Sequence, residues 1–318
     1  MTATPRPPGP AVTVRPSAVP SWRDFNQLTK VSISAASTFT AAAGYLAALR
    51  SFQWHLLTAL LGILLLAMGS CALNELQELK HDARMERTRG RPLPSGRVSP
   101  LGGLLIGVAL SGAGFALLLW RHGWPSALLG VLALVWYNGV YTPLKRVTAF
   151  AIIPGALIGS IPPAIGWAAA GGSLQSPAMF SLCLIFFLWQ VPHFWMLMLM
   201  HDQDYGRAGF PTLSRHFRAD QSGRLSFTWM AATAFSCAFL PVFGAVFSVP
   251  AMVILAAASL WLLWQATALL QARLDRAMFR RAFLSINLFA LVLLVAVIAD
   301  PYLPSPAARV SAVAQCQP

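Results

Sequence analysis

The chain has 318 residues, of which 57% are hydrophobic and only 10% are charged. Soluble globular proteins have roughly 25% charged residues, so this composition excludes a water-soluble enzyme. The apolar residues lie in long stretches without charge, which is typical of an all-α polytopic membrane protein. A net charge of +13 favours a nucleic-acid partner in a soluble protein, but loop cations in a membrane protein direct its insertion, and we expect no nucleic-acid partner.

The first thirty residues are rich in proline and contain no apolar run, which predicts a mobile polar arm over residues 1–30. Segments without Asp, Glu, Lys or Arg then follow, each about as long as a bilayer-crossing helix. They lie near residues 31–49, 52–74, 101–120, 124–143, 148–170, 177–200, 226–247, 249–271 and 282–299. We therefore expect a nine-transmembrane-helix bundle over residues 31–300 and a short C-terminal tail over residues 301–318.

Charged residues divide unequally between the two sets of connections that nine spans create. Twenty of the 23 Lys and Arg residues, and every acid except Asp300, lie on the N-terminal side. Positive residues favour the cytoplasmic face, so we expect a multi-pass protein of the cytoplasmic (inner) membrane with a cytoplasmic N terminus and a periplasmic C terminus. The long connections 75–100 and 201–225 hold seven of the ten acids on the cytoplasmic face. Loops of that length are typical of functional sites.

The first long connection begins with a stripe of oxygen-bearing side chains that recur every four residues and so share one helical face. Carboxylates at this spacing repel one another, and Mg²⁺ bound between them and the phosphate oxygens of a substrate removes that repulsion. A solvated helix of mixed charge fits the same pattern, so the stripe alone leaves both interpretations open. The stripe consists of Asn74, Glu78, Asp82 and Glu86, and a basic stripe of Lys80, Arg84, Arg87 and Arg91 offers partners for phosphate.

The second long connection carries another pair of acids. His193 and Asp204 fall on one helical stripe at the end of the sixth segment, with Asp202 beside it. Two separated carboxylate clusters at one membrane face, flanked by arginines, are what an enzyme needs to hold a diphosphate through bridging Mg²⁺. A transporter or lipid-binding scaffold is the alternative, but transporters place ionisable residues near the bilayer midplane, where these segments hold almost none.

Motifs spread along the chain carry a resemblance to a known family. They are Asn74-x-x-x-Glu78-x-x-x-Asp82, Met85 to Gly96, Tyr141 to Arg146, Gly155 to Gly166, Trp189-Gln-Val-Pro-His-Phe194 and Asp204-Tyr-x-x-Ala-Gly-x-Pro211. They resemble the motifs of the UbiA-type intramembrane prenyltransferases, and most closely those of the branch that farnesylates haem. The resemblance covers about residues 25–300. It implies a nine-helix bundle around a cavity that opens sideways to lipid, with both long loops over its cytoplasmic end.

The resemblance also implies a reaction and the residues that perform it. Enzymes of this branch transfer a farnesyl group from farnesyl diphosphate to a vinyl group of haem b, which releases diphosphate and yields haem O for terminal oxidases. Membrane lipid and downstream haem-modifying or oxidase-assembly proteins are the expected partners. Mg²⁺ is the expected cofactor, with Asn74, Glu78, Asp82, Asp202 and Asp204 as metal ligands and all of these except Asp202 as catalytic residues. The expected substrate-binding residues are Arg84, Arg87, Arg91, Lys145, Arg146, Asp202, His193 and Tyr205.

Two assignments stay open at this stage. His193 either contacts haem, through its iron or a propionate, or is a helix histidine bonded to protein. The acceptor is either haem b or another aromatic compound or quinone precursor, because residues that bind diphosphate say little about the acceptor.

Lys30, at the entrance of the first segment, is interpreted as a membrane-boundary residue. No side-chain nucleophile is expected, since this chemistry is electrostatic and positional.

Overall fold

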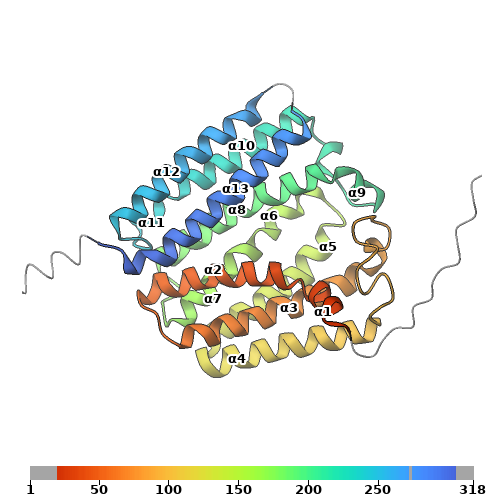
Figure 1. Ribbon diagram of the computed structural model, residues 1–318, viewed down its shortest axis with the longest axis horizontal. Helices are drawn as coiled ribbons and strands as arrows, with labels where there is room; N and C mark the ends of the chain where they lie inside the picture. The colour runs from red at the N-terminus through yellow and green to blue at the C-terminus, as the bar shows by residue number, and fades with distance from the viewer. Residues whose placement is uncertain (1–19, 272–273, 306–318) are drawn as a thin grey trace, which may run out of the picture.

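The computed structural model describes residues 20–271 and 274–305, which form helices and connections with no β-strand among them. The long helices run side by side as a bundle (Figure 1), which confirms the predicted all-α architecture. Residues 1–19 and 306–318, in the predicted arm and tail, lie outside the described residues. The last part of the predicted arm is helical, because α1 (Trp22–Thr29) forms there. Ser21 caps α1, with its Oγ accepting a hydrogen bond from the Asp24 N–H at 3.1 Å.

Long helices build the bundle, and short helices lie where the chain changes direction. The long helices are α2 (Val31–Leu49), α3 (His55–Asp82), α4 (Pro100–Val135), α7 (Leu157–Ala169), α8 (Pro177–Met200), α10 (Ala219–Ser236), α12 (Val249–Ala266) and α13 (Arg276–Ala299). The short ones are the π-helix η1 (Trp136–Tyr141), α5 (Thr142–Leu144), η2 (Ala149–Ala151), α6 (Ile152–Gly155), α9 (Asp202–Arg207), η3 (Leu213–Arg215), α11 (Phe239–Val242), η4 (Thr267–Leu270) and η5 (Asp300–Tyr302). Serine caps with a proline in the first turn start α4 and α12, at Ser99 and Ser248.

Eight helical stretches in the described part of the chain are long and apolar enough to cross a membrane, so the count of nine stays a prediction. The difference lies in the 45-residue stretch Pro100–Leu144, which contains the third and fourth predicted segments. One straight helix of that length would be about 68 Å long, roughly twice the thickness of a bilayer core. At Gly123 the backbone leaves the helical region (φ 77°, ψ −178°). The chain turns back there, since a Cβ at Gly130 would lie only 3.3 Å from the Leu118 side chain.

Helices α2 and α13 end at the same side of the bundle. Arg50, directly after α2, forms an ion pair with Asp300, directly after α13, with 2.5 Å between Nη1 and Oδ2. The fully buried Asp300 carboxylate also accepts hydrogen bonds from the backbone N–H groups of Phe247 and Ser248, at 3.1 and 2.8 Å. Helices α1 and α9 lie at the opposite side (Figure 1). Because α2 and α13 run in the same direction, the chain crosses the bundle an odd number of times.

Glycines allow α2 and α7 to pack at close range. A Cβ at Gly44 would collide with the Pro163 carbonyl oxygen, and one at Gly166 would collide with that of Ala41. Small residues at such contacts are a main source of helix association in lipid, where no hydrophobic effect operates between helices. Large apolar side chains such as Trp264 remain exposed on the outside of the bundle. The outer face is therefore suited to contact with acyl chains.

Candidate active site

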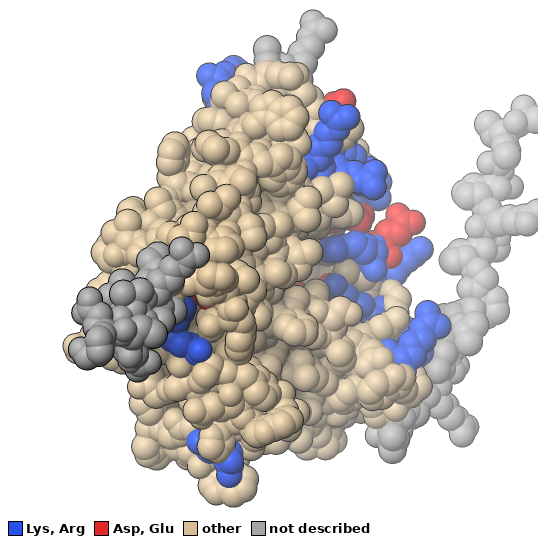
Figure 2. Space-filling model, turned by 60° about the vertical axis from the view of Figure 1, so that its left-hand side comes forward, with Lys and Arg blue, Asp and Glu red and all other residues tan. Residues whose placement is uncertain are grey.

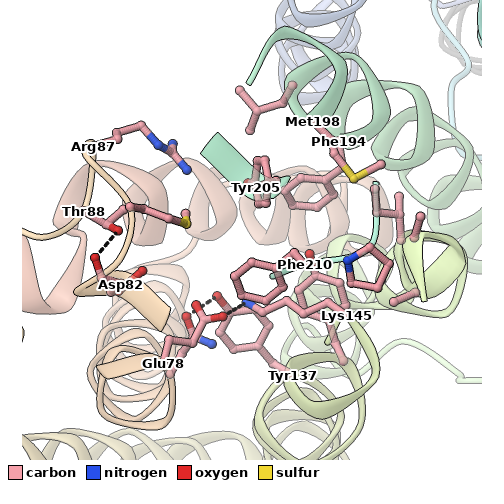
Figure 3. Close-up of a pocket in the computed structure, with 18 of the residues that line it drawn as sticks. Glu78, Asp82, Arg87, Thr88, Tyr137, Lys145, Phe194, Met198, Tyr205 and Phe210 are labelled. Carbon is pink, nitrogen blue, oxygen red and sulfur yellow. Dashed lines mark hydrogen bonds and ion pairs between the residues drawn. The ribbon is translucent and has the colours of Figure 1, made fainter. Parts of the chain in front are cut away.

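A pocket lined in part by Tyr205 of α9 is shown in Figure 3. Figure 1 shows α9 at the same end of the bundle as α1. Residues from α2, α3, η1, α8, α9 and the loop after α3 line the pocket, and these segments are far apart in the sequence. Most of the Lys, Arg, Asp and Glu side chains visible in Figure 2 gather on one side of the molecule. The polar lining consists of Lys30, Asn74, Glu78, Asp82, Arg87, Thr88, Arg91, Tyr137, Tyr141, Lys145, Thr148 and Tyr205.

Polar side chains on successive turns of α3 form one wall of the pocket. Asn74, Glu78 and Asp82 are 1%, 7% and 3% exposed, and each lines the pocket. Helix α3 ends at Asp82, so the predicted stripe of four residues stops after its third member. Glu86 lies beyond the helix with an exposed side chain outside the pocket lining. The structure thus brings together three of the four oxygen-bearing residues of the predicted stripe.

Both pocket carboxylates of α3 are paired with cations. Lys145 Nζ lies 2.6 Å from Glu78 Oε1, as Figure 3 shows, and Arg91 Nη1 lies 2.6 Å from Asp82 Oδ2. Burial lowers the pKa of the Lys145 ammonium, and the adjacent Glu78 carboxylate opposes that shift. Lys145 and Arg91 were predicted as substrate-binding residues, and both line the pocket. A phosphate bound there would compete with the carboxylates for these two cations.

Asn74 connects α3 to two other parts of the site. Its Nδ2 donates a hydrogen bond to Thr142 Oγ1 at 2.8 Å, and its Oδ1 accepts from Tyr137 Oη and Lys30 Nζ at 3.2 and 3.4 Å. Lys30 has a left-handed backbone (φ 48°), because α1 ends and α2 begins at this one residue. This turn brings Lys30 to the pocket, so its side chain contacts the site from the residue directly before the first membrane-spanning candidate helix. The sequence around Lys30 contains no glycine or proline to signal so sharp a turn.

The two long loops meet over the pocket. Met85, after α3, is 3% exposed and packs with Ala208 and Phe210 after α9, and Tyr205 of α9 packs against this cluster. The Arg87 guanidinium carbon lies 6.0 Å from the centre of the Tyr205 ring. Arg87 and Tyr205 were both predicted as substrate-binding residues, and both line the pocket (Figure 3). The pocket is thus roofed by apolar contacts between two loops that are distant in sequence.

Aromatic rings form another wall of the pocket. Tyr137 and Tyr141 project from the π-helix η1, and their rings stack with 5.8 Å between centres. Tyr141 also stacks on Phe194 of α8, with 6.4 Å between ring centres. Single π-turns occur frequently at functional sites, because the extra residue changes the direction of side chains along the helix. This wall offers electron-rich ring faces directly beside the charged groups of α3.

Five predicted site residues lie outside the pocket lining, and four of them are Arg84, Arg146, Asp202 and Asp204. The Arg84 side chain is exposed, and Arg146 donates to a backbone carbonyl of α3 at 2.7 Å. Asp202 accepts a hydrogen bond from the Ser214 hydroxyl at 2.7 Å, and Asp204 lies 4.0 Å from an arginine in its own helix. Helix α9 begins at Asp202 and directs its tyrosine, rather than its two acids, toward the pocket. The structure therefore does not assemble the predicted set of five metal ligands.

His193, another predicted substrate-binding residue, also lies outside the pocket lining. It is on α8, directly before Phe194, and its Nδ1 lies 2.8 Å from Asn287 Oδ1 of α13. The contact is to protein, as one of the two interpretations of the sequence expects. The second ring nitrogen makes no hydrogen bond within the described residues.

Glu75 is an acid near the site that the sequence analysis did not select. It is completely buried, and its Oε1 accepts a hydrogen bond from the Leu93 N–H at 3.3 Å, while Oε2 has no partner within the described residues. This bond ties the loop after α3 back to the helix. Glu75 precedes Glu78 by three residues and Asp82 by seven, which is also a helical-face spacing. The spacing of three and seven residues therefore indicates that Glu75 lies near the site, whereas a spacing of four residues alone does not include it.

The donor set of the pocket can be compared with the needs of a metal ion. No group of three or more His, Cys, Asp or Glu side chains within residues 20–271 and 274–305 is arranged to hold a metal. The pocket offers two carboxylates and one amide oxygen on one helical face. Mg²⁺ typically takes one or two carboxylates and completes its shell with water and substrate phosphate. The residues present therefore fit an ion that is bound together with a diphosphate.

Comparison with known proteins agrees with this geometry. Residues 36–299 match the model of the UbiA prenyltransferase family. A protoheme IX farnesyltransferase of Geobacter sulfurreducens is 47% identical over an alignment of 191 residues that covers 58% of this chain and 68% of that relative. The chain spans about two thirds of the length of the first curated relatives that it matches.

Solved structures share the fold. A UbiA homologue from Aeropyrum pernix superposes with a TM-score of 0.68 at 20% identity, covering 85% of this chain and 97% of that one. A UbiA homologue from Archaeoglobus fulgidus, bound to GPP and Mg²⁺, superposes with a TM-score of 0.62 at 14% identity, covering 87% and 99%. At these identities the likeness concerns the fold alone, whereas the family match covers most of the chain. The chain therefore belongs to the UbiA prenyltransferase family.

Proposed function

We propose that this chain transfers a farnesyl group from farnesyl diphosphate to a vinyl group of haem b, giving haem O and diphosphate. One observation carries the proposal: oxygen-bearing side chains on successive turns of α3 face a pocket in which each carboxylate is already opposed by a cation. This arrangement is suited to a metal-bound diphosphate. The name of the Geobacter relative supports haem as the acceptor.

The diphosphate would bind between α3 and the cations of the pocket. Asn74, Glu78 and Asp82 would hold Mg²⁺. The Archaeoglobus homologue bound to GPP and Mg²⁺ supports the use of this ion together with a prenyl diphosphate. When bound, the ion neutralises negative charge on the leaving diphosphate. Lys145 and Arg91 would then exchange their carboxylate partners for phosphate oxygens, at little electrostatic cost because each keeps an anionic partner.

Two more cations complete the phosphate contacts of the proposed site. Lys30 and Arg87 line the same pocket from the start of α2 and from the loop after α3. Neither is within 4.0 Å of a carboxylate in the described structure. Each is therefore available to phosphate without breaking an ion pair. Asp202 and Asp204 stay candidate metal ligands only for a state in which α9 moves.

Catalysis in this site would be electrostatic and positional. As the bond between C1 and the diphosphate oxygen breaks, Lys145 and Arg91 would stabilise the charge that develops on the leaving group. The allylic cation would lie against the rings of Tyr137 and Tyr141. C1 then bonds to the terminal vinyl carbon of haem b, and water adds its hydroxyl to the inner vinyl carbon with loss of one proton. The roof formed by Met85 and Phe210 would keep other water from the cation.

Diphosphate release by the purified protein in nanodiscs tests this function. We expect release only when farnesyl diphosphate, haem b and Mg²⁺ are all present, and loss of release when a chelator is added. Prenylation of another aromatic compound or quinone precursor is the alternative within the family. Release that depends on a phenolic acid and ignores haem b would favour that alternative. A transporter or scaffold would release no diphosphate under any of these conditions.

The charge distribution supports a defined orientation in the cytoplasmic membrane. The pocket lies at the side of the bundle that carries α1, and the cations gather at that side (Figure 2). The pocket would then face the cytoplasm, where a water-soluble diphosphate substrate is made. A reporter inserted after Gly90 should be cytoplasmic and one fused after Pro318 periplasmic. Two reporters on the same side would contradict both the orientation and an odd number of spans.

A further inference from the structure

A polar contact between α8 and α13 lies beside the pocket. His193 Nδ1 is 2.8 Å from Asn287 Oδ1, and both side chains are partly exposed. On α8, Phe194 and Leu197 line the pocket. Leu197 is four residues after His193, so the two share one face of the helix and lie about 6 Å apart along its axis. His193 therefore lies directly beside Phe194, which lines the pocket, and one turn deeper in the bundle than Leu197.

The second contact of Asn287 fixes the orientation of its amide. Asn287 Nδ2 donates to the Phe283 carbonyl oxygen at 2.5 Å. A backbone carbonyl oxygen only accepts hydrogen bonds, so the NH₂ group of the amide must face Phe283 and its oxygen must face His193. An amide oxygen is likewise only an acceptor. His193 must therefore carry its proton on Nδ1, which leaves the lone pair of a neutral imidazole on Nε2.

The surroundings of His193 hold its ring in one place and leave Nε2 without a protein partner. The ring centres of Trp189, Phe194 and Phe283 lie 4.9, 5.2 and 5.1 Å from that of the imidazole. Trp189 Nε1 donates to a backbone carbonyl of α13 at 3.0 Å, which adds a second tie between the same two helices. Within the described residues, His193 makes only the one hydrogen bond to Asn287. Nε2 is therefore free of protein partners within the described residues and is available to a ligand.

We propose that Asn287 is a positioning residue that presents Nε2 of His193 to the iron of the haem acceptor. The inference rests on the proposed function and extends it to the acceptor side of the same site. Neutral imidazole is a common ligand of haem iron, and a hydrogen bond from its other nitrogen sets the tautomer and the ring direction. Ligation at His193 anchors the porphyrin beside Phe194 and Tyr141, next to the place where the allylic cation forms.

The test is the absorption spectrum and equilibrium binding of haem b, measured with the purified protein in nanodiscs. Asn287→Leu removes the acceptor for Nδ1–H at similar volume. We expect loss of the spectrum of histidine-ligated haem and a 10- to 100-fold weaker affinity, the usual effect of losing a partner of a metal-bound histidine. Asn287→Asp keeps an acceptor and should keep the ligated spectrum, with a lower reduction potential because the imidazole becomes a stronger donor. His193→Ala should lose the ligated spectrum entirely.

Trp189→Phe is the matched control, because it removes a hydrogen bond between the same two helices but leaves the pair of His193 and Asn287 intact. It should keep the parent spectrum, with folding of every variant checked by thermal unfolding. A parent spectrum and affinity in Asn287→Leu would overturn the proposal and leave the proposed function standing. Equal losses in Trp189→Phe and Asn287→Leu would also overturn it, since they indicate packing alone. A parent protein that neither binds nor converts haem b would instead overturn the proposed function.

Discussion

Lys145 and Glu78 form an ion pair of 2.6 Å in the wall of the pocket, and Lys145 Nζ also lies 5.2 Å from the centre of the Tyr141 ring. The pair joins α3 to the segment after α5, and its side chains are 9% exposed for Glu78 and 20% for Lys145. One ammonium thus contacts both a carboxylate and an aromatic wall before any substrate binds. Substitutions in this ion pair can therefore separate its contribution to protein stability from its contribution to catalysis.

Removing one member of this pair should destabilise the protein more than removing both. Glu78→Gln leaves a largely buried ammonium without its anion, which we expect to cost roughly 1–3 kcal/mol of unfolding free energy. Adding Lys145→Met to that variant should recover most of this loss but restore no diphosphate release. A double-mutant cycle on thermal unfolding in detergent measures the coupling. Additive losses would show that the pair contributes nothing to stability.

Asp82→Asn should strongly slow turnover while the protein still inserts and folds. The substitution keeps the shape of the side chain but removes the charge that faces the pocket, and loss of one electrostatic stabiliser costs about 10²- to 10³-fold in rate. The measurement is the rate of diphosphate release at saturating Mg²⁺. Glu86→Gln is the control, since Glu86 is exposed beyond the end of α3 and should keep the parent rate. A near-normal rate in Asp82→Asn would place the diphosphate site elsewhere.

Acidic pH should loosen the contact between α1 and the loop after α3. Hydrogen bonds from Ser21 Oγ and Arg97 Nε, each 2.7 Å, hold the pKa of Asp24 below its usual range. Because the folded pKa lies below the unfolded value of about 3.9, the carboxylate stabilises the fold above that value and loses this effect as pH falls through the folded pKa. Asp24→Asn should therefore lower the Tm at pH 7 but hardly at pH 2. An equal decrease of the Tm at both pH values would contradict this.

Two glycines in membrane helices should respond in opposite ways to the same substitution. Gly44→Ala forces a Cβ into the Pro163 carbonyl and should destabilise the protein by roughly 1–3 kcal/mol, the usual cost of overpacking. At Gly112 a Cβ meets no atom within 4 Å, so Gly112→Ala should be neutral or stabilise by up to about 1 kcal/mol through helix propensity. Thermal unfolding in detergent compares the two. Similar Tm values for both variants would argue against the close contact of α2 and α7.

The sequence predicts the helices and one wall of the pocket because both depend on local spacing. Apolar runs of bilayer length mark the spans, and a spacing of four residues places Asn74, Glu78 and Asp82 on one helical face. The same rule extended the stripe to Glu86, which is wrong because the helix ends at Asp82. In the sequence, the end of this helix is indicated by Gly90 and Pro92 in the loop that follows.

The remaining features depend on contacts between distant parts of the chain, which spacing does not reveal. The turn at Lys30 brings an ammonium to Asn74, and Glu75 is buried by a loop that returns to it. The orientation of α9 depends on how Met85 packs against the second loop. Periodicity places Asp202 and Asp204 near the membrane face, but only the docked loops show that their helix directs Tyr205 to the pocket.

The most direct test of the central claim is mass spectrometry of haem extracted from membranes that contain this protein. Cells that make the parent chain should accumulate haem b carrying a hydroxyethylfarnesyl group, and the same cells making Asp82→Asn should contain only haem b. Equal amounts of the two proteins in the membrane fraction are the control. Unmodified haem b together with a prenylated phenol or quinone precursor in the parent sample, or equal prenylated haem in both samples, would contradict the account.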